Sequence, residues 1–354
     1  MIHEATLYER ISEGKVRCTA CSRYCILKDG QIGFCGVRKN VGGKLDLLAY
    51  GRPLVAQIDP IEKKPILHRY QGTWIYSIGT AGCNFACQFC QNYDVSQRRE
   101  IEGSYYMTPE QVVDNAVKEG CQGIAFTYNE PTIFIEYAKD IGLIAKEKGL
   151  ITVFVSNGYE TPEAIDELSD FLDCITVDFK GNANLSFYRR YMSVPSPEFI
   201  YDALKGLSKT GIHVEITDLV VPQIGDSIDD ARIMVQRVKE IFGDSIPVSF
   251  LRFHPDYKLM HLPSTPVETL IRHYEVAREE GMKYVYIGNV PGSIYQNTYC
   301  PECGSLCVER DMMRTISFNL TEDGRCRECG RKIDIKPLPE VRRNPQRISG
   351  WPFP

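Results

Sequence analysis

Short apolar runs alternate with amphipathic segments across the middle of the chain. Between about residues 72 and 290, the apolar runs are rich in β-branched and aromatic residues, and helical spacing of apolar positions falls between them. This alternation predicts βα units that build a parallel sheet. The predicted strands span residues 73–79, 123–128, 151–156, 174–179, 214–221, 247–253 and 283–288.

Three of the predicted helices open with a Thr-Pro pair. Thr108 is a predicted N-cap because Pro109 and Gln111 follow it in the first turn, and Gly120 ends that helix. Residues 161–168 and 265–281 repeat the same opening. We expect helices to begin at all three pairs.

The predicted strands are apolar along nearly their whole length, which indicates burial on both faces. We therefore expect an α/β fold built on a partial or complete parallel (β/α) barrel. A doubly wound open sheet is the alternative. The barrel core is expected over residues 72–292, between a cysteine-rich N-terminal segment at 1–71 and a C-terminal segment with a proline-rich tail at 293–354.

Polar clusters follow five of these strands at the points where the strands end. Cys83 comes shortly after the first strand, Glu130 after the second, and Ser156 at the end of the third. Asp178 and His254 take corresponding positions on two later strands. Because the βα loops of a parallel barrel gather at the carboxyl ends of its strands, these clusters are expected to line one rim.

Composition narrows the class of protein. Of the 354 residues, 43% are hydrophobic and 25% charged, which suits one main domain with small appendages. The formal net charge is −5 and there are no basic blocks, so nucleic acid is not an expected partner. The start has no apolar stretch of signal-peptide length, and no segment approaches the roughly 20 apolar residues of a membrane span. We expect a cytoplasmic protein with no membrane partner.

The fourteen cysteines cluster in a way that indicates metal binding. Tight spacing and the missing signal peptide favour thiolate–metal chemistry in a reducing compartment over disulfides. Cys121 and Cys174 adjoin predicted strands and are expected to be small buried apolar residues. Cys307 also stands outside the three groups, which are Cys18, Cys21, Cys25 and Cys35; Cys83, Cys87 and Cys90; and Cys300, Cys303, Cys326 and Cys329.

The middle group places three thiols in one short loop without a fourth. A structural zinc or iron–sulfur site normally has four protein ligands, whereas three leave one metal position open for substrate or cofactor. The alternative reading is a zinc loop that a distant ligand completes.

The loop, Cys83-Asn-Phe-Ala-Cys87-Gln-Phe-Cys90, resembles the C-x3-C-x-φ-C motif of the radical S-adenosylmethionine (SAM) superfamily, including the aromatic Phe89. The resemblance implies a [4Fe–4S] cluster on the three cysteines, whose free iron binds SAM. It also implies an external one-electron donor, and cleavage of SAM to methionine and a 5′-deoxyadenosyl radical.

Two further elements resemble SAM-binding motifs of this superfamily. Glu130 occupies the place of a GGE-type motif and would accept hydrogen bonds from the SAM ammonium group, although Tyr128 and Asn129 replace the two glycines. Ser156 and Asn157 resemble a "TNG" element of the enzymes that activate glycyl-radical enzymes. These side chains are implied contacts of SAM.

The resemblance also implies SAM contacts on two later strands. Asp178 and Lys180 resemble a "DLK" element, and His254 resembles an activase histidine near the cofactor. The alternatives are that Asp178 and Lys180 form a polar strand end and that His254 caps local backbone.

The resemblance extends over most of the chain. Residues 21–40, 50–68 and 284–292, with the C-terminal CxxC pairs, resemble the radical SAM member of the AmmeMemoRadiSam system, a relative of the pyruvate formate-lyase activating enzymes. This implies hydrogen abstraction from an unknown substrate, with a backbone glycine of a partner protein as one candidate. Radical methylation or rearrangement of a small molecule is one alternative. A non-catalytic multi-metal zinc scaffold or nucleic-acid-binding protein is the other.

The two flanking cysteine groups each supply four ligands. Cys300, Cys303, Cys326 and Cys329 have the pattern of a zinc ribbon, with rubredoxin-like iron as the competitor. For Cys18, Cys21, Cys25 and Cys35, zinc is the first expectation and an auxiliary iron–sulfur cluster the second, because the spacing differs from the ferredoxin run.

Overall fold

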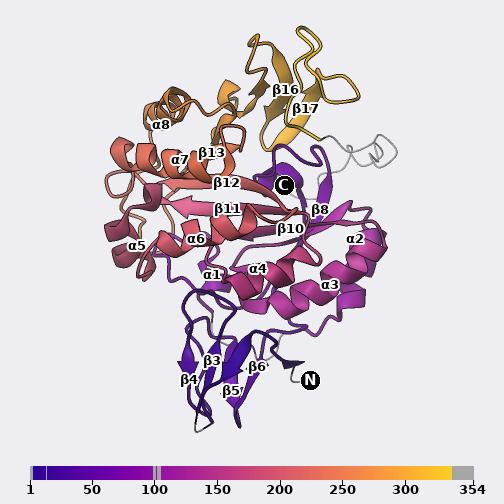
Figure 1. Cartoon of the computed structure of the whole chain (residues 1–354), viewed down its shortest axis with the longest axis vertical. Coiled ribbons are helices and arrows are strands. Elements are labelled where there is room, and N and C mark those ends of the chain that lie inside the picture. Colours follow the sequence, from indigo (N-terminus) through magenta and orange to yellow (C-terminus); the bar gives the residue numbers. More distant parts are fainter. Residues whose placement is uncertain (1–2, 13, 99–100, 102–104, 337–354) are drawn as a thin grey trace.

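An eight-stranded sheet lies at the centre of the molecule (Figure 1). The computed structural model describes residues 3–12, 14–98, 101 and 105–336. From β8 to β14 the strands run parallel in sequence order, and β7 runs antiparallel to β8 at one edge. The strands are β7 (Val55–Pro60), β8 (Trp74–Gly79), β9 (Gly123–Phe126), β10 (Ile151–Ser156), β11 (Cys174–Lys180), β12 (His213–Val220), β13 (Val248–Arg252) and β14 (Val285–Gly288).

The strand order identifies the sheet as a partial barrel. A doubly wound sheet reverses its order at a switch point, whereas here each strand pairs with the next one along the chain. Within the described ranges β14 and β7 do not pair, so the barrel stays open between these edges. The expected parallel barrel is confirmed in its partial form, and the doubly wound alternative is wrong.

All seven predicted strands are present, with small differences at their ends. β10 has the predicted bounds, whereas β9 ends at Phe126 because Tyr128 adopts a left-handed conformation with φ of 70°. β7 was not predicted, since three of its six side chains are exposed and it lacks a continuous apolar run. The predicted proline-rich tail lies outside the described residues.

Helices cover the outer face of the sheet (Figure 1). α2 packs on β8 and β9, α3 on β9 and β10, and α8 on β13 and β14. The helices are α1 (Tyr93–Ser96), α2 (Pro109–Lys118), α3 (Ile135–Glu147), α4 (Pro162–Ser169), α5 (Leu185–Met192), α6 (Glu198–Leu207), α7 (Ile228–Phe242) and α8 (Val267–Glu279), with short 3-10 helices η1 (Ile61–Lys63), η2 (Pro131–Phe134), η3 (Gly181–Ala183) and η4 (Ile294–Gln296).

Two of the three Thr-Pro pairs cap helices as predicted. At α2, the Thr108 hydroxyl accepts a hydrogen bond from the Gln111 N–H at 3.3 Å, and Gln111 Oε1 accepts one from the Thr108 N–H at 2.9 Å. At α4, the Thr161 hydroxyl accepts a hydrogen bond from the Ala164 N–H at 3.1 Å. Thr265 does not cap α8, because its buried hydroxyl donates to the Val220 carbonyl at 2.7 Å instead.

Side-chain alternation along β11 separates the two faces of the sheet. Ile175, Val177 and Phe179 are completely buried and belong to the main apolar core. Asp178 and Lys180 alternate with them and therefore point to the barrel interior. The interior at the carboxyl end is accordingly polar.

The segment between β7 and β8 closes the amino end of the barrel. Ile61 and Ile66 are completely buried in one cluster with Ile75 of β8. Glu215 of β12 accepts hydrogen bonds of 2.7 to 2.9 Å from the backbone N–H groups of residues 67–68. The carboxyl end is thus the end at which a site can open.

Two three-stranded sheets form the N-terminal segment, which an ion pair joins to α3. The buried Arg38 guanidinium donates to both carboxylate oxygens of Glu136, at 3.0 and 2.6 Å. Arg38 Nε donates to the Ile133 carbonyl at 2.9 Å. The strands are β1 (His3–Glu4), β6 (Lys44–Leu47) and β5 (Arg38–Val41) in one sheet, and β2 (Tyr8–Arg10), β3 (Val16–Cys18) and β4 (Ile26–Leu27) in the other.

The C-terminal segment lies at the opposite end of the molecule from the N-terminal sheets (Figure 1). Its apolar side chains cluster with Tyr284 and Tyr286 at β14, and Thr315 donates to Glu62, which follows β7, at 2.6 Å. It therefore bridges both edges of the open barrel. Its strands are β15 (Thr298–Tyr299), β16 (Leu306–Asp311) and β17 (Arg314–Phe318).

None of the helices within the described ranges is long and apolar enough to cross a lipid bilayer.

We predict that Arg38→Met lowers the free energy of unfolding by about 3–5 kcal/mol, because Glu136 would stay buried without its counter-charge. Chemical denaturation measures the change. Arg17→Met is the matched control, since Arg17 pairs with Glu9 at 3.4 Å on the surface and should contribute less than about 1 kcal/mol. Equal losses in the two variants would contradict the prediction.

Candidate functional site

A pocket opens at the carboxyl ends of the barrel strands. Positions at the ends of β9 to β13 contribute to it, as the shared register of parallel strands requires. It contains every residue predicted to contact the cluster or SAM except His254. These residues are Cys83, Cys87, Phe89, Cys90, Glu130, Ser156, Asn157, Asp178 and Lys180.

Backbone hydrogen bonds fix the three-cysteine loop to other parts of the fold. The Ala86 N–H donates to the Met192 carbonyl at 3.0 Å, and the Gln88 N–H donates to the Tyr191 carbonyl at 2.9 Å. Both acceptors lie at the end of α5. The loop is therefore positioned by a helix about a hundred residues further along the chain.

Asn129 ties the end of β9 to this loop. Its side-chain nitrogen donates to the Gly82 carbonyl at 2.8 Å, and its Oδ1 accepts from the Thr80 N–H at 3.2 Å. The Tyr128 hydroxyl donates to Asp59 Oδ2 at 2.7 Å. Tyr128 thus adopts a backbone conformation that glycine reaches more easily, and a hydrogen bond to β7 holds its side chain.

Glu130 is almost completely buried and links the loops after β9 and β10. Its Oε1 accepts from the Thr132 N–H at 3.1 Å and lies 3.0 Å from the Ser156 hydroxyl, while its Oε2 accepts from the Asn157 N–H at 2.8 Å. A carboxylate offers about four acceptor positions. Oε2 can therefore accept one further hydrogen bond from a ligand.

A second buried carboxylate, Glu160, lies behind Glu130. The Ser156 hydroxyl lies within hydrogen-bond distance of both carboxylates, and the Thr132 hydroxyl donates to Glu160 at 3.1 Å. Burial, reinforced by the charge of Glu160, raises the pKa of Glu130 to about 7. A cationic ligand group beside Glu130 would favour its ionised form.

Asp178 and Lys180 form an ion pair on the interior face of β11. Lys180 Nζ contacts Asp178 Oδ2, and Asp178 Oδ1 accepts a hydrogen bond from the Thr217 hydroxyl at 3.0 Å. Burial alone would lower the pKa of Lys180, but the negative charges of Asp178 and of the nearby Cys87 together outweigh it and the pKa rises. The pair thus presents both signs of charge to the pocket.

The three thiols suit a cluster better than a single metal ion. Burial raises the pKa of Cys83 to about 12 and raises that of Cys87 and Cys90, so bound metal is needed to hold them as thiolates. Within the described part of the chain, their sulfurs do not form a group within 4.8 Å of one another. Thiolates on one zinc would lie about 3.8 Å apart.

A buried acceptor in the pocket is available for a ligand. Asn157 Oδ1 has no hydrogen-bond partner among the described residues, whereas its Nδ2 donates to Asn84 Oδ1 at 2.7 Å. A donor group of SAM fits this position. Cluster and cofactor are thus both compatible with the residues present.

His254 lies apart from the other predicted cofactor contacts. It is exposed and lines a neighbouring cavity with Arg252 and Met313. Gln91 and Asn289 border both this cavity and the pocket. The structure therefore places His254 beside the site rather than within it.

Several residues of the site were not predicted from the sequence. Asn84 follows Cys83 directly, so its position in the loop was a usable signal. Glu160 and Ser96 carry no such signal, because only the fold brings Glu160 to Ser156 and places the Ser96 hydroxyl 3.1 Å from Cys90 Sγ.

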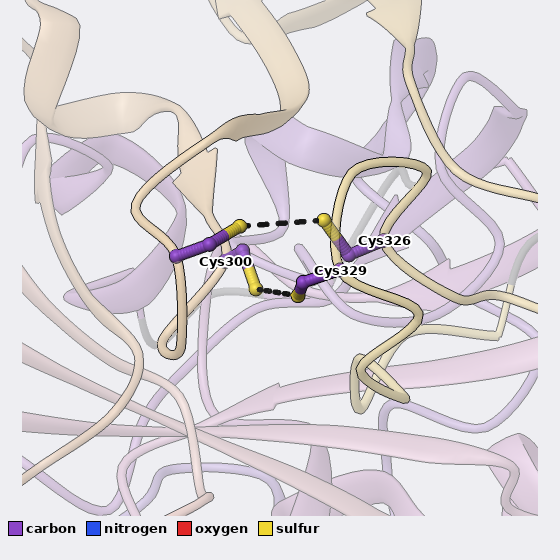
Figure 2. A group of neighbouring side chains, drawn as sticks. Cys300, Cys326 and Cys329 are labelled. Carbon is purple, nitrogen blue, oxygen red and sulfur yellow. Dashed lines mark hydrogen bonds between the residues drawn. The ribbon is translucent and has the colours of Figure 1, made fainter.

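The four C-terminal cysteines form a compact group that can hold one metal ion. Their sulfurs all lie within 4.8 Å of one another. Figure 2 shows Cys300 opposite Cys329. The sulfurs of these two residues are 3.6 Å apart. Cys303 and Cys326 are 3.7 Å apart. Both distances match the edge of a tetrahedron of thiolates around one ion with metal–sulfur bonds of about 2.3 Å.

Glycines shape the two turns that carry these cysteines. Gly304 and Gly330 have φ of 73° and 74°, and their N–H groups donate to the carbonyls of Cys300 and Cys326 at 2.9 Å. A side chain would strain both turns. Cys307 is buried nearby in the apolar cluster of this segment.

The four N-terminal cysteines line a separate cavity between the N-terminal sheets and the barrel rim. Cys18, Cys21 and Cys35 are buried and Cys25 is partly buried. Cys121 and Cys174 are buried within apolar clusters, as expected from their places beside strands.

Comparison with known proteins identifies a family. The model of the radical SAM superfamily matches residues 77–238. Uncharacterized protein MJ0808 of Methanocaldococcus jannaschii is 44% identical over 336 residues, which cover 94% of this chain and 99% of that protein. The pyruvate formate-lyase-activating enzyme of Clostridium pasteurianum is 23% identical over 166 residues, or 45% of this chain and 67% of the enzyme.

Solved structures give more distant likenesses. A domain of pyruvate-formate lyase-activating enzyme from Bacteroides vulgatus covers 47% of this chain and 99% of its own, with 14% identity and a TM-score of 0.42. Streptococcus suis SuiB bound to S-adenosylmethionine covers 65% of this chain and 53% of its own, with 13% identity and a TM-score of 0.47.

The family model spans the three-cysteine loop and β9 to β12, which contribute most of the strand ends in the pocket. Members of this family bind SAM and a [4Fe–4S] cluster, and their chemistry is radical chemistry. A relative also aligns with nearly the whole chain. The chain therefore belongs to the radical SAM superfamily.

Proposed function

We propose that this enzyme cleaves SAM reductively and abstracts a hydrogen atom from a substrate bound at the mouth of the barrel. The observation that best supports this proposal is the shared pocket. Two buried thiols and the partly buried thiol of Cys90 line the same pocket as Glu130, Asn157 and the pair formed by Asp178 and Lys180.

In this proposal Cys83, Cys87 and Cys90 hold the [4Fe–4S] cluster and leave one iron for SAM. When bound, the cluster supplies the electron that breaks the C5′–S bond of SAM, which yields methionine and a 5′-deoxyadenosyl radical. An external one-electron donor is then a required partner. Phe89 packs against Phe187 with ring centroids 5.5 Å apart and gives the loop an apolar side.

The chain's own polar side chains orient SAM. Glu130 Oε2 accepts a hydrogen bond from the SAM ammonium group, and Asn157 Oδ1, which has no partner among the described residues, accepts a second one. Ser156 holds Glu130 in place. Asp178 and Lys180 offer an acceptor and a donor to the ribose or the methionine carboxylate.

The adjoining cavity is the proposed place for substrate. Arg252 and His254 line one part of it, and Met312 and Met313 of the C-terminal segment line another. A protein segment that presents a backbone glycine is the proposed substrate class, because the cavity combines polar donors with flexible apolar side chains. The likeness to a pyruvate formate-lyase-activating enzyme supports the same class.

The other assignments follow from this function. We propose membership of the AmmeMemoRadiSam system and a cytoplasmic location, which suits so many free thiols. We also propose three functional units: the N-terminal segment at 1–71, the radical SAM core at 72–292 and a C-terminal zinc ribbon within 293–354. Zinc is the proposed ion of the C-terminal cysteines.

The first prediction concerns cleavage. Replacing Cys83, Cys87 or Cys90 singly with alanine should abolish formation of 5′-deoxyadenosine from SAM, since two thiolates cannot hold the cluster. The assay uses anaerobically reconstituted protein with dithionite as reductant. Cys121→Ala is the matched control and should retain activity. Cleavage at the wild-type rate in any of the three variants, or none in the wild type, would contradict the proposal and favour a non-catalytic scaffold.

A second prediction concerns the SAM ammonium group. Glu130→Gln should weaken SAM binding by roughly 1.5–3 kcal/mol, the contribution of a charge-assisted hydrogen bond. Equilibrium binding to the reconstituted protein measures this. Glu62→Gln changes a buried carboxylate in the segment that closes the amino end of the barrel and should leave the affinity unchanged. Wild-type SAM affinity in the Glu130→Gln variant would contradict this role of Glu130. It would indicate that Asn129 or backbone carbonyls accept the hydrogen bonds of the ammonium group.

The third prediction separates the C-terminal metal from the cluster. Cys326→Ser should remove about one zinc per chain and lower the melting temperature, because the binding energy of a structural zinc site is also folding energy. The iron content should stay unchanged. Cys307→Ala, a cysteine of the same segment outside the four-sulfur group, should keep its zinc. Loss of iron in Cys326→Ser would assign iron to this site instead.

A further inference from the structure

The four N-terminal cysteines surround one cavity rather than one point. Cys18, Cys21, Cys25 and Cys35 all line it. A Cβ atom on Gly33 would lie 3.8 Å from Cys35 Sγ and 3.9 Å from Cys25 Sγ, so both thiols lie close to this glycine. The cavity is small and partly open to solvent.

The spacing of these thiols differs from that of the C-terminal group. Among the described residues, only the C-terminal cysteines form a group of three or more ligand atoms within 4.8 Å of one another. No three of the N-terminal sulfurs therefore come that close, although all four line the same cavity. In this respect they resemble Cys83, Cys87 and Cys90.

The distance between thiolate sulfurs differs between a one-zinc site and a [4Fe–4S] cluster. Four thiolates on one zinc lie about 3.8 Å from one another. A cubane puts an iron between each thiolate and the centre, so its thiolates lie about 6 Å apart. The wider spacing of these four thiols matches the cubane better than a single zinc ion. Each of the four irons of such a cubane would then have a protein ligand.

The cavity lies directly beside the three-cysteine loop. Asn84 lines it, and the Asn84 Oδ1 atom is 3.7 Å from Cys83 Sγ. Arg23, which also lines the cavity, donates from its Nε to the Asn84 carbonyl. A Cβ atom on Gly82 would lie 2.2 Å from the Cys35 carbonyl oxygen, so the two cysteine segments are in backbone contact.

Positive charge is available for an anionic cluster. Four thiolates and a [4Fe–4S] core of charge +2 carry a net charge of about −2. Arg23 and Arg38 both line the cavity. Arg38 is already neutralised by Glu136, whereas Arg23 has only carbonyl acceptors and a stacked Phe34 ring in the described structure.

We propose that Cys18, Cys21, Cys25 and Cys35 hold a second, fully ligated [4Fe–4S] cluster directly beside the three-cysteine loop. The sequence favoured zinc here, but the spacing of the thiols favours the cluster. The proposal does not depend on the substrate proposed above, because it concerns only which metal centre these four thiols bind.

Metal analysis and spectroscopy of the anaerobically reconstituted full chain test this proposal. The wild type should contain about eight irons and about one zinc per chain. The triple variant Cys83→Ser/Cys87→Ser/Cys90→Ser should keep about four irons. After reduction, its electron paramagnetic resonance spectrum should not change on addition of SAM, since no iron of the second cluster is open.

The reciprocal variant Cys21→Ser/Cys25→Ser should lose about four irons and keep a spectrum that SAM alters. Cys121→Ser/Cys174→Ser is the matched control and should keep all the iron. About four irons and two zincs in the wild type, or no iron in the triple variant, would overturn the proposal. The triple variant keeps the test decisive if the reciprocal variant fails to fold. Failure of radical chemistry is recognised separately, as loss of SAM cleavage with both clusters present.

Discussion

Parallel strands in sequence order impose the constraint on which this molecule depends. Each strand pairs with the next, so all carboxyl ends meet along one edge and all loops that carry polar residues gather there. Side-chain alternation then decides which residues of each strand end enter the pocket. Asp178 and Lys180 enter it, whereas Phe179 between them packs in the core. The site is a consequence of register as much as of residue type.

Much of this arrangement could be predicted from the sequence. The apolar strands are buried on both faces, so their runs were easy to recognise, and Thr108 and Thr161 marked helix starts through local hydrogen bonds. Local signals failed where a distant partner decides the outcome. Thr265 donates its hydroxyl hydrogen bond to the carbonyl of Val220 in β12 instead of capping a helix. β7 pairs with β8 although its sequence is not strongly apolar.

In the candidate site, too, the features with a local sequence signal could be predicted, whereas those that depend on the fold could not. Strand-end positions brought nine of the ten predicted cofactor contacts to one pocket, while their roles stay predictions. His254 follows a strand end too, but sequence does not give the depth of a side chain, and it lies in the adjoining cavity. The positions of the cysteines in the sequence likewise give the number of ligands, but not the distances between the sulfur atoms. The compact C-terminal group and the wider N-terminal group each have four cysteines, and only the fold distinguishes them.

The ion pair between Arg38 and Glu136 has a consequence for how the protein is made. Its partners lie 98 residues apart, which a ribosome needs about 5 to 20 s to add at ordinary rates of synthesis. Until α3 emerges, the N-terminal sheets have no surface to dock on, and their four thiols are synthesised long before the barrel can cover them. During that interval the nascent chain offers these thiols to the metal-delivery and oxidising agents of the cell. A metal that binds these four thiols would therefore be selected by competition during translation as well as by affinity in the finished fold.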